Sequence, residues 1–240
     1  MRQPKVLIMD IETAPMIAYV WGLKDQNIGL NQIKQDWSVL AWSAKWLGQK
    51  KVYYMDQSKS PNPYTDLHLL VGIWELLNEA DVVITQFGSG FDGPRLNARF
   101  IMSGMNPPSA YRHLDTYRIA KRVADFTSNK LEYLTDKLCT KYKKLSHKKF
   151  PGMSLWTECL NGNKQAWAEM KRYNIHDVLS TEELYIALQK WTPVSMPSVH
   201  HLCPARFAIH WGSRPYKGSL YKRMYCKKCK EYFKGDKIDG

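Results

Sequence analysis

The 240-residue chain lacks several features that would set it apart from ordinary globular proteins. No stretch approaches the roughly 18 consecutive apolar residues that a membrane span requires. Pro4, Lys5 and Asp10 interrupt the first ten residues, so the apolar core of a signal peptide is missing there. Five cysteines, an odd number, do not make a disulfide framework. These absences predict a water-soluble protein of a reducing compartment, the cytoplasm, with no membrane partner.

What the chain has in excess is positive charge. Lys and Arg number 35 against 22 Asp and Glu, which gives a formal net charge of +13. Such an excess favours a polyanionic partner, such as nucleic acid or an acidic membrane surface. The hydrophobic share of 44% and the charged share of 24% are those of a globular chain, which excludes wholesale disorder. The length suits one domain with a small appendage, and we expect a monomer.

Short apolar runs alternate with helical patterns over residues 1–191. The expected strands are 6–9, 39–47, 52–55 and 82–84. Asp66 is expected to cap a helix with apolar residues at helical spacing from Leu69 to Leu77, and another helix follows Pro94. Further helices are expected at 116–123, preceded by Asp115 as a cap, and at 129–139, 163–171 and 173–190. The alternation predicts an α/β domain with helices on the faces of a sheet.

The character of the sequence changes after Trp191. Two prolines and two serines predict a linker over residues 192–199. Residues 200–240 then carry ten Lys and Arg against three Asp and Glu, an excess of seven, together with three of the five cysteines. We therefore expect a separate small basic module at 200–240.

Asp10 and Glu12 stand two residues apart at the end of the first expected strand. Period-two geometry points both side chains to the same face of the sheet. Crowded carboxylates need a cation, and hard oxygen ligands of this kind suit Mg²⁺ or Mn²⁺. Taken alone, however, such a pair is more often a solvated surface pair.

Two later segments also carry acids. Asp92 follows the strand near 82–87 through a glycine-flanked loop, and by itself it is equally well explained as a helix N-cap. Tyr173 and Asp177 are four residues apart, so they share one face of the last helix. His176 points off that face and is expected to be structural or a peripheral phosphate contact.

In this order, the three segments resemble the DEDD (DnaQ-like) 3′–5′ exonucleases of the ribonuclease H-like fold, tyrosine subtype. The resemblance covers about residues 4–190 and rests on MDIETAP at 9–15, FDGPRLNARF at 91–100, SNKLEYL at 128–134 and YNIHDV at 173–178. It implies a mixed sheet flanked by helices. Many such enzymes are phage-encoded, which would place this chain in a host cytoplasm. Arg172 occupies the position of the histidine subtype's base, so the spacing excludes that subtype.

The resemblance also implies an active site. Asp10, Glu12, Asp92 and Asp177 would hold two divalent ions, Mg²⁺ or Mn²⁺, at the scissile phosphate. Two ions about 3.5–4 Å apart activate the attacking water and stabilise the leaving 3′ oxygen. Tyr173 would orient that water, since an unperturbed pKa of about 10 makes tyrosine a poor base at neutral pH.

The expected reaction is stepwise hydrolysis at DNA 3′ ends, which releases nucleoside 5′-monophosphates. A 3′–5′ exoribonuclease remains an alternative, as does a nucleic-acid-binding protein whose exonuclease fold no longer cuts. One departure concerns the second alternative: where relatives read His-Asn-Gly, this chain has Gln86, Phe87 and Gly88. The ligands are untouched, but the way in which the terminal nucleotide is positioned is in question.

A second metal site is expected in the basic module. Cys226 and Cys229 form a CxxC knuckle, which in a lysine-rich, reduced context indicates zinc. His200 and Cys203 are the best further ligands, although His201 or His210 could replace His200. Similar phage exonucleases end in a zinc ribbon, but here Arg206 stands in place of one ribbon cysteine. The alternative is a metal-free cysteine pair.

Clusters of basic residues are candidate nucleic-acid contacts. Lysines crowd one loop between two helices, and basic residues alternate with aromatic rings in the module, a combination that suits single-stranded nucleic acid. The candidates are Lys141, Lys143, Lys144, Lys148, Lys149, Arg206, Lys222, Arg223, Lys227 and Lys228. For the loop, a plain solvated surface is an equally good interpretation.

Overall fold

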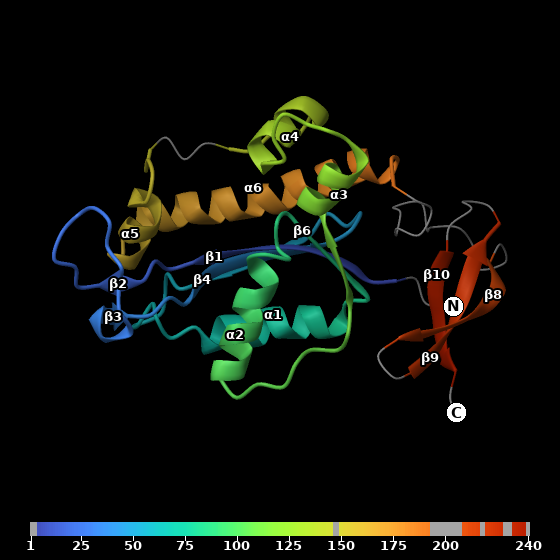
Figure 1. Cartoon of the computed structure of the whole chain (residues 1–240), viewed down its shortest axis with the longest axis horizontal. Helices are drawn as coiled ribbons and strands as arrows, with labels where there is room; N and C mark the ends of the chain where they lie inside the picture. Colours follow the sequence, from blue (N-terminus) through green and yellow to red (C-terminus); the bar gives the residue numbers. More distant parts are fainter. Residues whose placement is uncertain (1–3, 146–148, 193–207, 217–218, 228–231, 239–240) are drawn as a thin grey trace.

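The computed structural model describes residues 4–145, 149–192, 208–216, 219–227 and 232–238. Its main body is a five-stranded mixed sheet in the order β5-β4-β1-β6-β7 (Figure 1). The strands are β1 (Val6–Thr13), β4 (Val39–Trp46), β5 (Val52–Asp56), β6 (Val82–Thr85) and β7 (Arg112–Asp115). β1 pairs antiparallel with β4 and parallel with β6, which in turn pairs parallel with β7. The carboxyl ends of β1, β6 and β7 therefore lie at one edge of the sheet.

Helices cover both faces of this sheet. The helices α1 (Leu67–Glu79) and α2 (Asp92–Met102) lie on one face, and α3 (Thr116–Val123), α4 (Leu131–Leu138), α5 (Ser154–Leu160) and α6 (Lys164–Gln189) lie on the other (Figure 1). The predicted α/β fold, a mixed sheet flanked by helices, is confirmed.

The alternation of side chains along β1 decides which face receives the acids. Val6 and Ile8 pack in the hydrophobic cluster that contains residues of α3, α4 and α6, whereas Leu7 and Met9 pack against α1 and α2. The two acids that follow, Asp10 and Glu12, continue the even-numbered series. They therefore project toward the α6 face of the sheet.

Smaller elements complete the described chain. The strands β2 (Ile17–Ala18) and β3 (Ile33–Gln35) form a two-stranded sheet after β1, with a 3₁₀ turn at Leu30–Gln32. In the C-terminal region, β8 (Ala208–Tyr216), β9 (Ser219–Cys226) and β10 (Tyr232–Ile238) form an antiparallel sheet in the order β10-β9-β8. Among the described residues, none of the helices has the length and apolar character needed to cross a bilayer.

The expected helices at 163–171 and 173–190 are wrong as two elements, because α6 runs unbroken for 26 residues. Asn163 begins it, with a side chain that accepts hydrogen bonds from the backbone N–H groups of Gln165 and Ala166. No glycine or proline interrupts the segment, so the helix continues through Arg172 and carries Tyr173 and Asp177 in its middle.

Asp66 is the N-cap residue of α1, as expected, but the expected capping by its side chain is wrong. The side chain makes no capping hydrogen bond. Its carboxylate instead accepts from the backbone N–H of Val39 at 2.8 Å and from the guanidinium of Arg99 at 2.7 and 2.8 Å. Asp66 is buried, and a bidentate charge-assisted pair stabilises a buried carboxylate better than one backbone N–H does. The residue therefore ties β4 to α2.

Candidate active site

Three elements bring the predicted acids together at one edge of the sheet. Asp10 and Glu12 come from the end of β1, Asp92 is the first residue of α2, and Asp177 lies in the middle of α6. We call these four residues the acidic cluster. Asp92 and Asp177 are almost fully buried, with 3% and 4% of their surface exposed.

Burial is the main cause that raises the pKa values of three of these carboxylates, and neighbouring acids add to it. Burial raises the pKa of Asp10 well above its usual range, and the charges of Asp92, Glu12 and Asp177 raise it further. Burial, followed by the charge of Asp177, raises the pKa of Glu12 to about 8. Burial also raises the pKa of Asp92 to about 7, although the backbone N–H of Ile11 opposes it. The acidic cluster thus holds like charges in a poorly solvated place, where a cation is strongly favoured.

Each member of the acidic cluster accepts a hydrogen bond from a different donor. The Ile11 N–H donates to Asp92 Oδ1 at 3.0 Å, and the Asn174 amide donates to Asp10 Oδ2 at 2.7 Å. The Trp156 indole N–H donates to Glu12 Oε2 at 2.9 Å, and the Lys144 ammonium donates to Asp177 Oδ2 at 2.7 Å. Asp92 is the first residue of α2 and Phe91 is its N-cap, so the alternative explanation of Asp92 as a helix N-cap is wrong. Its carboxylate reaches across to β1 instead.

The ammonium group of Lys144 lies directly against the acidic cluster. Its ammonium contacts Asp177 and also lies 4.8 Å from the centre of the Tyr173 ring. Burial lowers the pKa of Lys144, but Asp177 and Tyr173 outweigh it, so the net shift is upward and the ammonium stays charged. Lys144 therefore supplies the single positive charge that the structure places directly on the acidic cluster among the described residues.

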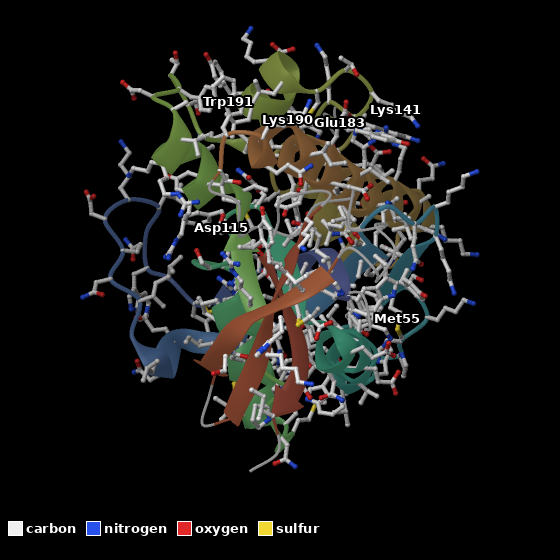
Figure 2. All side chains as sticks on the ribbon, turned by 90° about the vertical axis from the view of Figure 1, so that its right-hand side faces the viewer. Met55, Asp115, Lys141, Glu183, Lys190 and Trp191 are labelled. Carbon is white, nitrogen blue, oxygen red and sulfur yellow. The ribbon has the colours of Figure 1, made fainter. Side chains whose placement is uncertain are left out.

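The segment that delivers Lys144 is anchored to α6. The carboxylate of Glu183 accepts hydrogen bonds from the backbone N–H groups of Thr140, Lys141 and Tyr142, at 2.7 to 3.2 Å. Figure 2 shows Lys141 and Glu183 close to each other at one end of the molecule. The Thr135 hydroxyl then accepts from the Lys144 N–H at 3.1 Å. The loop is thus fixed on both sides of its lysines.

Tyr173 is buried beside the acids. Burial, followed by the charge of Asp177, raises the pKa of Tyr173 to about 12. Its ring meets the Trp156 ring edge to face, with centroids 6.4 Å apart. A phenol with this pKa keeps its proton at neutral pH, so Tyr173 can donate a hydrogen bond but cannot act as a base there.

The next question is whether the acidic cluster, with the hydrogen bonds described above, can hold a metal ion. Among the described residues, no three His, Cys, Asp or Glu side chains converge tightly enough to enclose an ion as they stand. The chemistry of the donor set nevertheless fits: the cluster offers only carboxylate oxygens, which hard divalent cations prefer. The ammonium of Lys144 shows where positive charge is already stabilised. A cation would therefore have to displace hydrogen bonds that the carboxylates now accept, because the acids do not already form a closed coordination shell.

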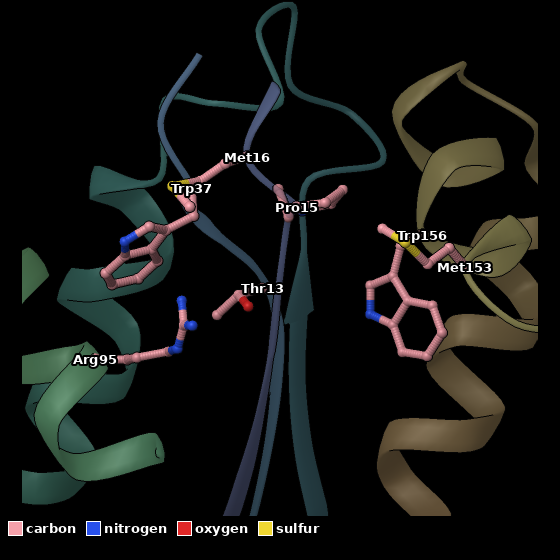
Figure 3. Close-up of a pocket in the computed structure, with 8 residues that line it drawn as sticks. Thr13, Pro15, Met16, Trp37, Arg95, Met153 and Trp156 are labelled. Atoms are coloured by element: carbon pink, nitrogen blue, oxygen red, sulfur yellow. The ribbon is translucent and has the colours of Figure 1, made fainter. Parts of the chain in front are cut away.

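A cavity of about 340 Å³ opens beside Thr13, the residue that follows Glu12. Trp156, the donor to Glu12, is part of its lining. Figure 3 shows Trp37 and Arg95 on one side, Trp156 and Met153 on the other, and Thr13 between them. The Arg95 guanidinium carbon lies 4.5 Å from the centre of the Trp37 ring. The volume and the aromatic walls suit a nucleoside-sized ligand next to the acids.

The structure describes only some of the residues predicted to contact nucleic acid or to bind zinc. Lys141, Lys143 and Lys149 are exposed, whereas Lys144 turns inward to Asp177. In the basic module, Lys222 and Lys227 are exposed. Outside the described residues lie Lys148, His200, Cys203, Arg206, Lys228 and Cys229, together with the side chains of Arg223 and Cys226. The roles of all these residues in binding zinc or nucleic acid stay predictions.

Three further observations concern residues discussed in the sequence. The side chain of Asp115 accepts from the Tyr117 N–H, so the predicted cap is confirmed. His176 bonds to the Lys143 carbonyl oxygen and meets the Tyr142 ring, which fits the expected structural role. Cys139 and Cys159 are buried free thiols.

Sequence reasoning missed two partners of the acids. Asn174 had a usable signal, because it stands three residues before Asp177 and so shares its helix face. Trp156 had none, since the short helix α5 that carries it was not expected and its contact with Glu12 joins residues 144 positions apart.

Comparison with known proteins agrees with this geometry. The sequence model of the RNase H superfamily matches residues 29–189, about two thirds of the chain. The chain belongs to the RNase H superfamily. The match includes α2 and α6, and β1 lies before its start. Membership supports a nuclease of this superfamily that acts on nucleic acid.

A solved structure adds information on the fold. The chain is similar to the family B DNA polymerase from the hyperthermophilic archaeon Pyrobaculum calidifontis, with a TM-score of 0.53 and 14% sequence identity. The similarity covers 80% of this chain and 26% of the polymerase, so the RNase H superfamily chain corresponds to about a quarter of that protein. A comparison with curated proteins gives no match.

Proposed function

We propose that the chain is a metal-dependent 3′–5′ exonuclease that hydrolyses DNA ends and releases nucleoside 5′-monophosphates. The observation that carries the proposal is the convergence of Asp10, Glu12, Asp92 and Asp177 in one poorly solvated place. Burial raises the pKa values of Asp10, Glu12 and Asp92, and the charge of Asp177 raises those of Asp10 and Glu12 further. Maintaining this repulsion is unfavourable for a purely structural site, but it favours cation binding.

The acidic cluster would hold two Mg²⁺ or Mn²⁺ ions. When bound, such ions increase the acidity of water and neutralise the charge on the leaving 3′ oxygen. The residues of this chain supply the rest. Tyr173 keeps its proton and would donate a hydrogen bond that orients the attacking water, next to Asp177. Trp156 and Asn174 hold the carboxylates of Glu12 and Asp10 in place.

The cavity lined by Thr13 and Trp156 would receive the terminal nucleoside. Its walls carry Trp37 and Trp156, on which a base can stack, and the Arg95 guanidinium supplies a positive charge. Because Trp156 both lines the cavity and donates a hydrogen bond to Glu12, a nucleoside placed there would bring its phosphate toward the carboxylates.

The direct test is a nuclease assay with a 5′-labelled single-stranded oligonucleotide. We expect stepwise shortening from the 3′ end with Mg²⁺ or Mn²⁺ and none with EDTA. Asp10→Asn and Asp92→Asn should each lower the rate at least about 100-fold, since losing an ion ligand costs several kcal/mol of transition-state stabilisation. Asp136→Asn is the matched control, because Asp136 is an exposed acid on α4 that pairs with Lys143. It should retain full activity.

The fold of each variant is checked by thermal unfolding in EDTA. Asp10→Asn removes a charge that burial and three acids disfavour, so its melting temperature should equal or exceed that of the unchanged protein. Full activity in both acid variants, or in EDTA, would reject the proposal.

The same assay also tests the two alternative functions. Labelled RNA tests the exoribonuclease, and preferential cleavage of RNA over DNA would support it. A protein that binds the oligonucleotide but never shortens it, with either ion, would be a binding protein with an inactive nuclease fold. Gln86 and Phe87, where relatives read His-Asn, are the feature that favours this last alternative.

A further inference from the structure

The loop between β6 and α2 holds an aromatic residue in an uncommon conformation. Phe87 has a φ of 62°, which lies in the left-handed region that bulky residues avoid. The residue before it, Gln86, has an ordinary negative φ. The residue after it, Gly88, passes so close to β6 that a Cβ atom there would lie 2.2 Å from the Thr85 hydroxyl oxygen. A strained bulky residue persists only where the surrounding structure holds it.

Asp115 is the residue that holds this loop. Its carboxylate accepts hydrogen bonds from the backbone N–H of Phe87 at 2.9 Å, and from the N–H and hydroxyl of Ser89 at 3.1 and 2.5 Å. The Gly93 N–H donates to the Gly88 carbonyl oxygen at 2.9 Å, which ties the loop to the first turn of α2. The backbone of Phe87 is therefore fixed next to the helix turn that begins with Asp92.

The Phe87 ring is directed outward. Half of its surface, 50%, is exposed, although an apolar ring would gain from burial. The ring meets that of Tyr117 of α3 edge to face, with centroids 5.1 Å apart. Gly90 adjoins the ring, because a Cβ atom there would lie 3.0 Å from it. The loop thus presents a flat apolar surface at the edge of the sheet that carries the acidic cluster.

Positive charges continue from this ring along α3. Arg118, Lys121 and Arg122 are exposed, whereas Ile119 and Ala120 are buried against the core. The spacing of i, i+3 and i+4 puts the three cations on one side of the helix, and Tyr117 borders that side. We call Arg118, Lys121 and Arg122 the α3 basic face.

We propose that Phe87 and the α3 basic face bind the single-stranded substrate upstream of the scissile phosphate, with an unpaired base stacked on Phe87 and backbone phosphates along α3. This inference rests on the proposed function and adds two things to it. It defines a binding surface, and it makes Phe87 a positioning residue that selects unpaired ends.

Two observations favour this occupant over others. The faces of the bases inside a duplex are already stacked on each other, whereas an unpaired base offers its face to a ring, so Phe87 favours a single strand over a duplex. Cations spaced along one helix face match a row of phosphates, and they do so without reading sequence. An acidic protein segment would satisfy the charges but has no need of a strained ring at the edge of the active site.

The test is equilibrium binding of a fluorescent single-stranded oligonucleotide to the full chain in EDTA, where no cleavage occurs. Phe87→Asn removes the ring and suits a φ of 62°, because asparagine adopts the left-handed region readily. We expect it to weaken binding roughly tenfold while the melting temperature is unchanged or higher. Phe87→Trp keeps a stacking surface and should bind like the unchanged protein. Trp191→Ala is the matched control, since Trp191 is 75% exposed at the end of α6.

An abasic scan locates the stacked base. A single abasic position, moved along the last nucleotides of the oligonucleotide, should weaken binding of the unchanged protein at one position, and Phe87→Asn should be insensitive there. If Phe87→Asn binds as tightly as the unchanged protein, or if the abasic effects persist in it, the proposal is overturned. A Phe87→Asn variant that loses self-association rather than oligonucleotide binding would equally overturn it, in favour of a protein partner.

Failure of this proposal can be distinguished from failure of the proposed function. Binding is measured without metal, whereas the nuclease test depends on metal and on Asp10. A protein that cuts normally but binds equally with or without the Phe87 ring keeps the proposed function and loses this inference. A protein that neither binds nor cuts the oligonucleotide loses both.

Discussion

At the scale of single residues, Lys144 determines the electrostatics of the metal-free acidic cluster. Four carboxylates share one neighbourhood, and a single ammonium lies on it, 2.7 Å from Asp177. The side chains of this ion pair are only 24% and 5% exposed, so water screens the pair weakly. Lys144 therefore stands where a divalent cation would also be favoured, and the two should compete.

We expect Lys144→Met to destabilise the protein in EDTA and to make it respond more strongly to Mg²⁺. Removing one partner of a buried ion pair leaves the other charge uncompensated, at a cost of about 3–5 kcal/mol. Added Mg²⁺ should then restore stability, because ligand binding to the folded state alone raises its stability. Thermal unfolding across a Mg²⁺ titration measures both effects.

Lys143→Met is the control for that measurement. Lys143 pairs with Asp136 at 3.1 Å, but both side chains are more than half exposed. Exposed pairs contribute only about 0–1 kcal/mol, so the melting temperature should change little with or without Mg²⁺. Equal losses in the two variants would mean that Lys144 acts as an ordinary surface lysine.

At the scale of elements, Asp115 joins three of them: it ends β7, caps α3 and holds the loop that precedes α2. Asp115→Ala should lower the free energy of unfolding by about 2–4 kcal/mol, since it removes a helix cap and hydrogen bonds to a charged acceptor. Asp115→Asn keeps one acceptor oxygen and should lose about half as much. Chemical denaturation of both variants tests this order.

Asp125→Ala provides the comparison for Asp115. Asp125 is an exposed acid that follows the same helix, so its removal should change the free energy of unfolding by less than about 0.5 kcal/mol. If Asp115→Ala behaves like Asp125→Ala, then α3 and the Phe87 loop do not depend on the Asp115 carboxylate.

The elements also show what the sequence could and could not predict. Strands rich in apolar and β-forming residues, such as β4 and β6, and the helix α3 were predicted nearly to their ends, because composition, periodicity and caps are local signals. β7 was missed, since Leu114 is its only apolar residue. Its place is set by pairing with β6, a contact that no local pattern encodes.

The same distinction holds at the site. Local patterns drew attention to the acids, at the ends of apolar runs and on one helix face, but only the resemblance of their order to the DEDD exonucleases joined them into one site. The structure brings all four together. The inward turn of Lys144 was not predicted. It depends on the course of a loop that Glu183 fixes from α6, about 40 residues further along the chain.

At the scale of the whole molecule, positive charge is distributed over separate surfaces. The net charge is +13, and residues 200–240 alone hold an excess of seven basic residues. In the RNase H superfamily domain, the exposed lysines near 141–149 and the α3 basic face carry further cations. A polyanion that contacts more than one of these surfaces would bind with a steep dependence on salt, because each neutralised phosphate of a single strand contributes about 0.7 to the slope.

The division into residues 1–191 and a zinc-binding module at 200–240 is the prediction that belongs to this scale. We expect limited proteolysis of the full chain to cut first within 192–199 and to leave two resistant fragments, because packed backbone resists cleavage while linkers do not. Metal analysis should find about one zinc per chain, bound through Cys226 and Cys229. A strong chelator should then expose the C-terminal fragment to digestion and leave the larger one intact, since structural zinc supplies folding free energy to small modules.

Cys229→Ser should behave like the chelated protein, whereas Cys139→Ala, which alters a buried free thiol in the larger domain, should keep its zinc. A C-terminal fragment that resists protease equally well with and without the chelator would show that its three strands are held by their own packing.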